Sequence, residues 1–192
     1  MRLFLAVGPA GAARDELARE LTAVRRHLAA WDDHIRWTPP ENVHVTVRFL
    51  GETPAPRVVA LVAALGDRLE IAPFEVTVGD PGVFASRGAV RTLWFAIRED
   101  GDALARLHDD VSRILERAGW PADERPFTPH VTVGRVREGR RRQTAGLAAA
   151  VASRPASWQR WTIDRLILYS SDLSGPRPVH HAVHAVRLDP RG

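Results

Sequence analysis

The tetrapeptide His-Val-Thr-Val occurs twice in this sequence, at residues 44–47 and 130–133, and a proline lies shortly before each copy. Both copies are rich in β-branched residues and alternate polar with apolar side chains, which predicts a half-buried strand for each. In a strand, the histidine and threonine of each copy share one face and the two valines share the other. The sequence therefore predicts two imidazole–hydroxyl pairs able to exchange protons and to bind an oxyanion.

Such groups suit the hydrolysis of a cyclic phosphodiester. The reaction needs a base that takes a proton from water and an acid that protonates the leaving ribose oxygen. His44 and His130 fit these roles, because the unperturbed pKa of histidine is about 6.5, and a bell-shaped pH–rate profile is expected. Thr46 and Thr132 would donate to the non-bridging oxygens, where charge develops. This chemistry needs no metal, and we find no obvious carboxylate cluster in the sequence to hold one. A lone strand histidine is more often a surface residue than a catalyst, so the catalytic interpretation depends on the motif being present twice.

The elements that must position these pairs follow from hydrophobic periodicity. Strands and helices occur without regular alternation, and several neighbouring strands lack a helix between them, which favours an α+β fold with antiparallel sheets. We expect helices outside and a cleft between two similar halves, with residues 1–192 forming one domain. The expected strands are 2–7, 43–50, 74–78, 92–97, 131–136, 163–169 and 179–188, the expected helices are 12–30, 56–70, 102–118 and 140–152, and a turn is expected at 79–82.

Composition narrows the classes of function. The chain has no cysteine, which excludes disulfides and thiolate metal sites. Its net charge is +4, and all 27 basic residues are arginine, whose planar fork matches phosphate oxygens, although a simple compositional bias toward arginine explains the same count. The apolar run near the N-terminus is shorter than the roughly 7–15 residues of a signal peptide, and none approaches the roughly 18 residues of a membrane span. We expect a cytoplasmic protein.

At this point the chain resembles a known family, the bacterial and archaeal RNA 2′,3′-cyclic phosphodiesterases, also called 2′-5′ RNA ligases, of the 2H phosphoesterase superfamily. Two His-x-Thr/Ser-x motifs are the hallmark of that family. The resemblance implies a bilobal α+β fold, with two antiparallel sheets flanking a central cleft and helices on the outside, and no cofactor. The similar segments are 2–6, 40–51, 125–135 and 168–173.

The resemblance also implies an activity, the opening of a 2′,3′-cyclic phosphate to a 2′-phosphate with the 3′ oxygen leaving. By analogy, His44 would protonate the leaving oxygen and His130 would activate water. Arg135 matches a basic residue of the second motif and would bind phosphate together with the threonines. Because Arg135 has the opposite strand parity to His130, either Gly134 must loosen the strand or the arginine must curl back.

Two further residues complete the expected site. Phe4 matches a base-stacking residue of the family, and core packing is an equally good explanation for it. Arg48 shares a strand face with His44 on simple alternation, so it is expected to help bind substrate. One departure stands out: the family usually has a tyrosine after Gly175-Pro176, whereas this chain continues Arg-Pro-Val and then His180.

Several alternatives remain open from the sequence alone. The histidines at positions 180, 181 and 184 hint weakly at a metal site, because only two of them share a strand face and neither has an obvious carboxylate partner. The substrate is either RNA ending in a 2′,3′-cyclic phosphate or a small cyclic nucleotide, and the same site could act on 2′-5′ linkages, with ligation as the reverse reaction. A non-catalytic RNA-binding protein is the alternative from a different class. A monomer is expected.

Overall fold

The computed structural model describes residues 1–99, 102–123, 126–155, 157, 159–175 and 177–189. Its strands form one hydrogen-bonded path in the order β4-β10-β9-β1-β3-β7-β6-β5-β8, and β2 pairs with β7 off this path. Every pairing is antiparallel except that of β10 with β4. The α+β fold expected from the sequence is confirmed.

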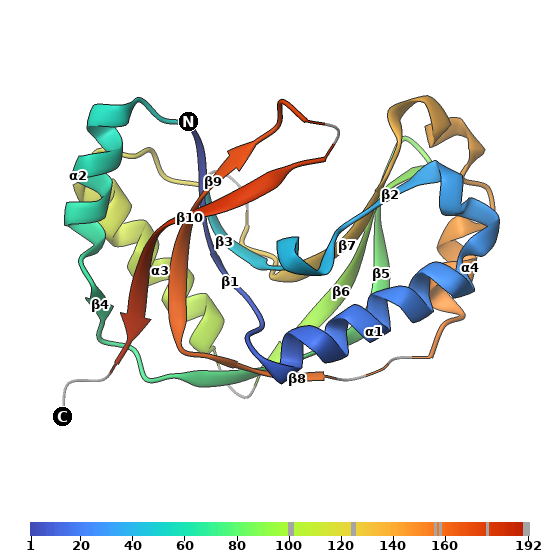
Figure 1. Ribbon diagram of the computed structural model, residues 1–192, viewed down its shortest axis with the longest axis horizontal. Coiled ribbons are helices and arrows are strands. Elements are labelled where there is room, and N and C mark those ends of the chain that lie inside the picture. The colour runs from blue at the N-terminus through green and yellow to red at the C-terminus, as the bar shows by residue number, and fades with distance from the viewer. Residues whose placement is uncertain (100–101, 124–125, 156, 158, 176, 190–192) are drawn as a thin grey trace.

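The strands divide into two lobes, each with its own helices on the outer side (Figure 1). The first lobe contains β1 (Arg2–Val7), β3 (Val45–Glu52), β4 (Arg68–Leu69), β9 (Arg165–Asp172) and β10 (Val179–Leu188), with α2 (Ala55–Leu65) and α3 (Ala103–Arg117). The second lobe contains β2 (Ile35–Trp37), β5 (Phe74–Ser86), β6 (Ala89–Glu99), β7 (His130–Val136) and β8 (Gln159–Ile163), with α1 (Ala12–His27) and α4 (Leu147–Ala152). Short 3-10 helices are η1 (Ala29–His34), η2 (Pro40–Asn42) and η3 (Glu138–Gln143).

The lobes meet where β3 pairs with β7, and a single antiparallel pair, Val45 with Val131, makes this joint. Both valines are completely buried. The two expected sheets are therefore joined edge to edge rather than separate, and the lobes diverge from the joint (Figure 1). Because the joint lies within the two His-Val-Thr-Val segments, the fold brings the repeated motif together from positions far apart in the chain.

Apolar helix stripes bury against these sheets, as the periodicity predicts. In α1, the buried apolar residues are Leu17, Leu21 and Val24, beside the buried Glu20, and Leu28 follows just after the helix. This helix follows β1 of the first lobe but packs on the second lobe, against β8. The crossing ties the two lobes together. No helix in the described part of the chain is long and apolar enough to cross a membrane.

Several expected boundaries were wrong, each for a physical reason. The turn expected at 79–82 lies inside β5, because its pairing with β6 absorbs extra residues in a bulge between Val78 and Pro81. The actual hairpin turn is Arg87-Gly88, where both residues have positive φ. The short strands β2 and β4, with three and two residues, are too short to show a periodic signal, and β8, with five residues, was also not expected. The expected helix 140–152 divides into η3 and α4.

The strand β2 packs tightly on the middle of β7 at Gly134. Trp37 of β2 pairs with Gly134, and a Cβ placed on this glycine would lie 2.7 Å from Cγ2 of Ile35. Real Cβ contacts are longer than this, so the position tolerates no side chain without movement of β2. The glycine thus permits the close contact between β2 and the motif-bearing strand.

We expect Gly134→Val to lower the melting temperature by roughly 2–10 °C, since overpacking costs about 1–3 kcal/mol and a chain of this size loses a few degrees per kcal/mol. Gly139→Ala is the control, because a Cβ at Gly139 meets no atom within 4 Å. Thermal unfolding followed by circular dichroism measures both. An unchanged melting temperature for Gly134→Val would contradict the tight packing of β2 on β7.

Candidate active site

The two motifs form opposite parts of one cavity between the lobes. Val45 opposes Val131, so continuing the antiparallel register sets His44 beside Thr132 and His130 beside Thr46. The buried valines face the core, and the four polar side chains line a cavity of about 520 Å³. Its other lining residues are Arg2, Phe4, Arg36, Trp37, Thr38, Pro39, Asn42, Phe49, Arg135, Ser171, Leu173, Arg177, Pro178 and His180.

Each motif histidine is held in the same way by the residue two positions before it in the chain. The Nδ1 atom of His44 lies 2.7 Å from the carbonyl oxygen of Asn42, and Nδ1 of His130 lies 2.8 Å from the carbonyl oxygen of Thr128. A carbonyl only accepts hydrogen bonds, so Nδ1 carries the proton and donates it in both rings. This arrangement fixes the ring orientation and makes Nε2 the atom available for proton transfer.

The last residue of the motif forms a bulge in both strands. Thr46 pairs with Ala6 and Arg48 with Leu5, so Val47 is the extra residue of β3. In the second lobe, Thr132 pairs with Trp94 and Gly134 with Leu93, so residue 133 is extra in β7. A bulge shifts the side-chain alternation by one residue. Beyond each motif, the residue that turns to the cavity is therefore the one that simple alternation would point away.

The bulge in β7 explains how Arg135 reaches the cavity. Of the two expected routes, a loosened strand near Gly134 or an arginine that curls back, the register agrees with the first, because the extra residue directly precedes this glycine. Arg135 lines the cavity, and its Nη1 donates to Oγ1 of Thr92 at 3.3 Å. Desolvation, and to a smaller extent the nearby Arg36, lower the pKa of the Arg135 guanidinium. A phosphate in the cavity would relieve both effects, because it supplies the missing opposite charge.

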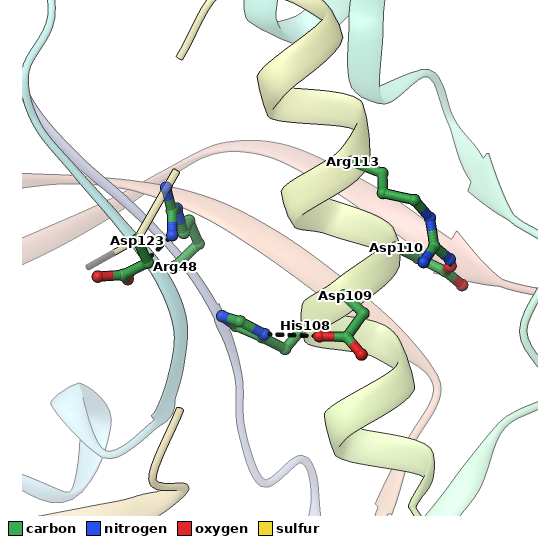
Figure 2. A network of polar contacts seen from close by, with 6 residues as sticks. All are labelled: Arg48, His108, Asp109, Asp110, Arg113 and Asp123. Carbon is green, nitrogen blue, oxygen red and sulfur yellow. Dashed lines mark hydrogen bonds and ion pairs between the residues drawn. The ribbon is translucent and has the colours of Figure 1, made fainter. Parts of the chain in front are cut away.

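The same bulge turns Arg48 away from the cavity, which corrects the expectation that it shares a face with His44. Arg48 is only 4% exposed, and its Nη1 lies 3.0 Å from Oδ2 of Asp123 (Figure 2). Its Nη2 donates to the carbonyl oxygen of Pro121. The guanidinium therefore fastens the segment after α3 to β3, and Phe49 occupies the cavity position instead.

Phe4 contributes to both the core and the cavity wall. It is 5% exposed, and its ring centroid lies 4.8 Å from that of His44. Tyr169 stacks on it at 5.3 Å. The two roles considered for Phe4 are thus compatible in one position, and the small exposed part of the ring faces the cavity.

His180 lies in the cavity where the family pattern departs. Its ring meets Phe4 edge-on at 5.0 Å and His44 edge-on at 5.5 Å. Desolvation, and then the adjacent His181, lower the pKa of His180. His184 does not join His180 in a metal site, because Nε2 of His184 lies 2.7 Å from the carbonyl oxygen of Gly66, away from this cavity. Pro176, before this segment, lies outside the described residues.

Sequence reasoning missed several wall residues that come from connecting segments. The side-chain amide of Asn42 donates to the carbonyl oxygen of Pro178 at 2.8 Å, joining η2 to the start of β10. Arg36 and Arg177 add positive charge to the wall. Phe49 was missed because the bulge has no sequence signature here. Asn42 and Phe49 do lie within the 40–51 segment that carries the first motif, and that was the one available signal.

The two motif histidines differ in their electrostatic environment. The pKa of His44 is lowered to about 4, chiefly by desolvation; the hydrogen bond to Asn42 opposes this shift, and the positive charges of His180, Arg135 and His130 add to it. His44 is therefore neutral at pH 7 in the free protein. Among the described residues, no group of three or more His, Cys, Asp or Glu side chains is placed to hold a metal ion.

The family assignment follows from comparison with known proteins. The family model described as the 2′-5′ RNA ligase superfamily matches residues 13–175. The chain belongs to this superfamily. Proteins called RNA 2′,3′-cyclic phosphodiesterase are similar to it, for example that of Archaeoglobus fulgidus, with 31% identity over 71% of this chain and 73% of the relative. The corresponding protein of Thermus thermophilus is 30% identical over 98% of this chain and 90% of the relative.

Other comparisons define how far the likeness extends. A relative of the same name from Geobacillus stearothermophilus is 30% identical over 71% of this chain, and the match spans only 43% of that longer protein. Among solved structures, LigT of E. coli in its apo form superposes with a TM-score of 0.73 at 23% identity, covering 97% of this chain and 96% of LigT. A Thermus thermophilus structure gives a TM-score of 0.71 at 24% identity, with 97% of each chain covered. These structures support the superfamily fold.

The lowered pKa of His44 predicts how stability depends on pH. Since the folded protein holds this ring neutral, stability is complete above the unfolded pKa of about 6.5 and is lost as pH falls toward about 4. Between pH 7 and pH 4, the unfolding free energy of the wild type should fall by about 2–3 kcal/mol more than that of His44→Gln. Urea denaturation at several pH values measures this difference.

The control for this experiment is His181→Gln, which removes an exposed histidine of β10. We expect its pH dependence to follow that of the wild type. Parallel curves for His44→Gln and wild type would show that the His44 ring is not held neutral by burial.

Proposed function

We propose that this chain is an RNA 2′,3′-cyclic phosphodiesterase that opens a terminal 2′,3′-cyclic phosphate to a 2′-phosphate. The observation that carries the proposal is the pairing of two His–Thr sets around one cavity, with Nδ1 of each histidine fixed by a backbone carbonyl. This arrangement offers one base and one acid on opposite sides of a phosphorus centre, as hydrolysis requires. Membership of the 2′-5′ RNA ligase superfamily, and relatives named for this activity, support it.

The geometry favours one division of labour. His44 lies against Phe4, which is the aromatic surface suited to the base of the terminal nucleoside, so the ribose oxygen leaves on the His44 side. The hydrogen bond from the His130 ring to the carbonyl oxygen of Thr128 is exposed, so water reaches His130 more easily than it reaches His44. We therefore assign His44 as the acid that protonates the 3′ oxygen and His130 as the base that activates water.

The acid role requires a proton that His44 lacks in the free protein. A phosphate monoanion bound beside the ring supplies the opposite charge, which favours the imidazolium and raises the pKa of His44. Substrate binding thus charges the acid that the substrate then uses. Thr46 and Thr132 donate to the non-bridging oxygens, and Arg135 compensates their negative charge.

The proposed substrate is an RNA end, with a small cyclic nucleotide as the alternative that the same cavity admits. The arginines of the wall, Arg2, Arg36 and Arg177, favour a polyanion. The reaction needs no cofactor and no metal, because the two imidazoles and the cationic wall supply proton transfer and charge compensation. As expected from the sequence, we propose a monomer that acts in the cytoplasm. A binding protein without turnover is the other candidate, and the intact His–Thr pairs argue against it.

We expect the wild type to convert a short RNA ending in a 2′,3′-cyclic phosphate to the 2′-phosphate in the presence of EDTA. His44→Ala and His130→Ala should each lower kcat by about 10²- to 10⁴-fold, the usual contribution of a general acid or base. His181→Ala, outside the cavity, should leave the rate unchanged. The turnover rates of the wild type and the three variants are measured by chromatographic separation of the products.

Other results would identify the error. Loss of wild-type turnover in EDTA, restored by a divalent cation, would replace the proposal with a metal-dependent mechanism. Tight binding of the RNA with the ring left closed would make the chain a binder. Turnover of cyclic mononucleotides alone would reassign the substrate to the smaller class.

The division of labour predicts a second result. p-Nitrophenolate leaves without needing a proton, so bis(p-nitrophenyl) phosphate makes the acid dispensable but not the base. We expect His44→Ala to keep within about tenfold of wild-type activity on this compound, and His130→Ala to lose activity on it, a loss typically of 10²- to 10⁴-fold. Release of p-nitrophenolate followed by absorbance measures both. The reverse ranking of the two variants would exchange the roles of the histidines.

A further inference from the structure

Each lobe carries an aromatic pair beside its motif histidine. In the first lobe, Phe4 and Tyr169 stack next to His44. In the second lobe, Phe84 of β5 lies 5.2 Å from the Trp94 ring and meets His130 edge-on at 4.9 Å. The first pair belongs to the proposed substrate site. The second pair has no role in the reaction described so far.

The strand registers relate Phe84 to Tyr169, whereas the counterpart of Phe4 is Thr92 rather than Trp94. Phe4 pairs with Phe49, which follows the bulge of β3, and Tyr169 is the next partner across the sheet. In the second lobe, Arg135 follows the bulge of β7 and pairs with Thr92, whose partner across the sheet is Phe84. Phe84 therefore occupies the position that Tyr169 has in the other lobe. It belongs to the same face of the sheet as the motif threonine and the cavity arginine.

Phe84 is rigidly supported and exposed at the same time. Trp94 lies beneath it, over Gly82, where any Cβ would overlap the tryptophan ring. The absence of a side chain at Gly82 thus lets the indole lie flat and support the phenyl ring. Phe84 remains 38% exposed, whereas Phe4 is only 5% exposed. An exposed aromatic ring on a fixed support, next to an active-site histidine, has the properties of a base-stacking platform.

The geometry of phosphoryl transfer says which nucleoside such a platform would take. In an in-line displacement, the attacking and leaving oxygens lie on opposite sides of phosphorus. The terminal ribose lies on the His44 side in the proposed mechanism, so the oxygen opposite it lies at His130. In hydrolysis this is a water oxygen. In a phosphodiester between two nucleosides it is the 5′ oxygen of the second nucleoside.

We propose that Phe84, supported by Trp94, binds the base of a second nucleoside whose 5′ oxygen is attached to the phosphate on the His130 side. This inference rests on the proposed function, because it places the phosphate between His44 and His130. The substrate class is a 2′-5′-linked dinucleoside monophosphate. Its 3′-hydroxyl gives a proton to His44 and attacks phosphorus, the bond from phosphorus to O5′ breaks, and O5′ takes a proton from His130. The products are a 2′,3′-cyclic phosphate and a free nucleoside.

The test compares two substrates that differ in the second nucleoside, 2′,3′-cyclic AMP and adenylyl-(2′→5′)-adenosine. Phe84→Leu keeps the apolar volume and removes the aromatic face, and Phe84→Tyr retains the face. We expect Phe84→Leu to lower kcat/KM for the dinucleotide by roughly 5- to 100-fold, the usual effect of losing one stacked base. Its kcat/KM for cyclic AMP should stay within about twofold of wild type, and Phe84→Tyr should behave as wild type on both.

Four results would overturn the proposal. Equal losses on both substrates would mean that Phe84 only positions His130, and unchanged rates on both would remove it from the site. If the wild type turns over cyclic AMP but not the dinucleotide, the measurement becomes the inhibition of cyclic AMP turnover by the dinucleotide. An inhibition constant that Phe84→Leu leaves unchanged would then overturn the proposal. If neither substrate turns over, the proposed function fails, and calorimetric binding of the dinucleotide to wild type and Phe84→Leu still decides whether Phe84 takes a base.

Discussion

The single pairing of Val45 with Val131 is the constraint on which the site depends. Two completely buried valines join the edge strands of the lobes, and each is flanked in its own strand by the polar residues of its motif. A longer ladder would have continued as an ordinary flat sheet, with no cavity between the lobes. A joint of one pair holds the histidines close together while the lobes diverge, so the same contact creates both the proximity of the imidazoles and the space for a substrate.

The repeated bulge then determines what surrounds the histidines. Side-chain alternation carries the histidine and threonine of each motif to the cavity, and the extra residue afterwards reverses the alternation. Arg135 enters the cavity for this reason, and Arg48 leaves it to pair with Asp123. The same local irregularity, present in both strands, thus separates an arginine that lines the cavity from an arginine that pairs with Asp123 at the back of β3. Neither role follows from residue type, since both positions carry the same side chain.

These features set the limit of prediction from sequence. His44, Thr46, His130 and Thr132 could be found because each pair is local and the motif is repeated, and the long buried strands and helices could be found from their periodicity. The position of Arg48 could not, because a bulge is decided by the pairing partner rather than by the strand itself. Walls built from distant segments, such as the contact between Asn42 and the start of β10, leave no periodic signal either. Short strands with two or three residues fail for the same reason.

The two histidines are symmetric in their hydrogen bonds and asymmetric in their surroundings. Each donates through Nδ1 to a backbone carbonyl, so the fold gives both rings the same tautomer. Burial and neighbouring positive charges then favour the neutral form of His44. In the proposed mechanism, an acid that becomes charged only when phosphate is bound avoids a desolvated imidazolium in the empty cavity, where it would destabilise the fold and repel Arg135. The cost of burying His44 would then be offset by the substrate, which would couple affinity for phosphate to the protonation that the leaving oxygen requires.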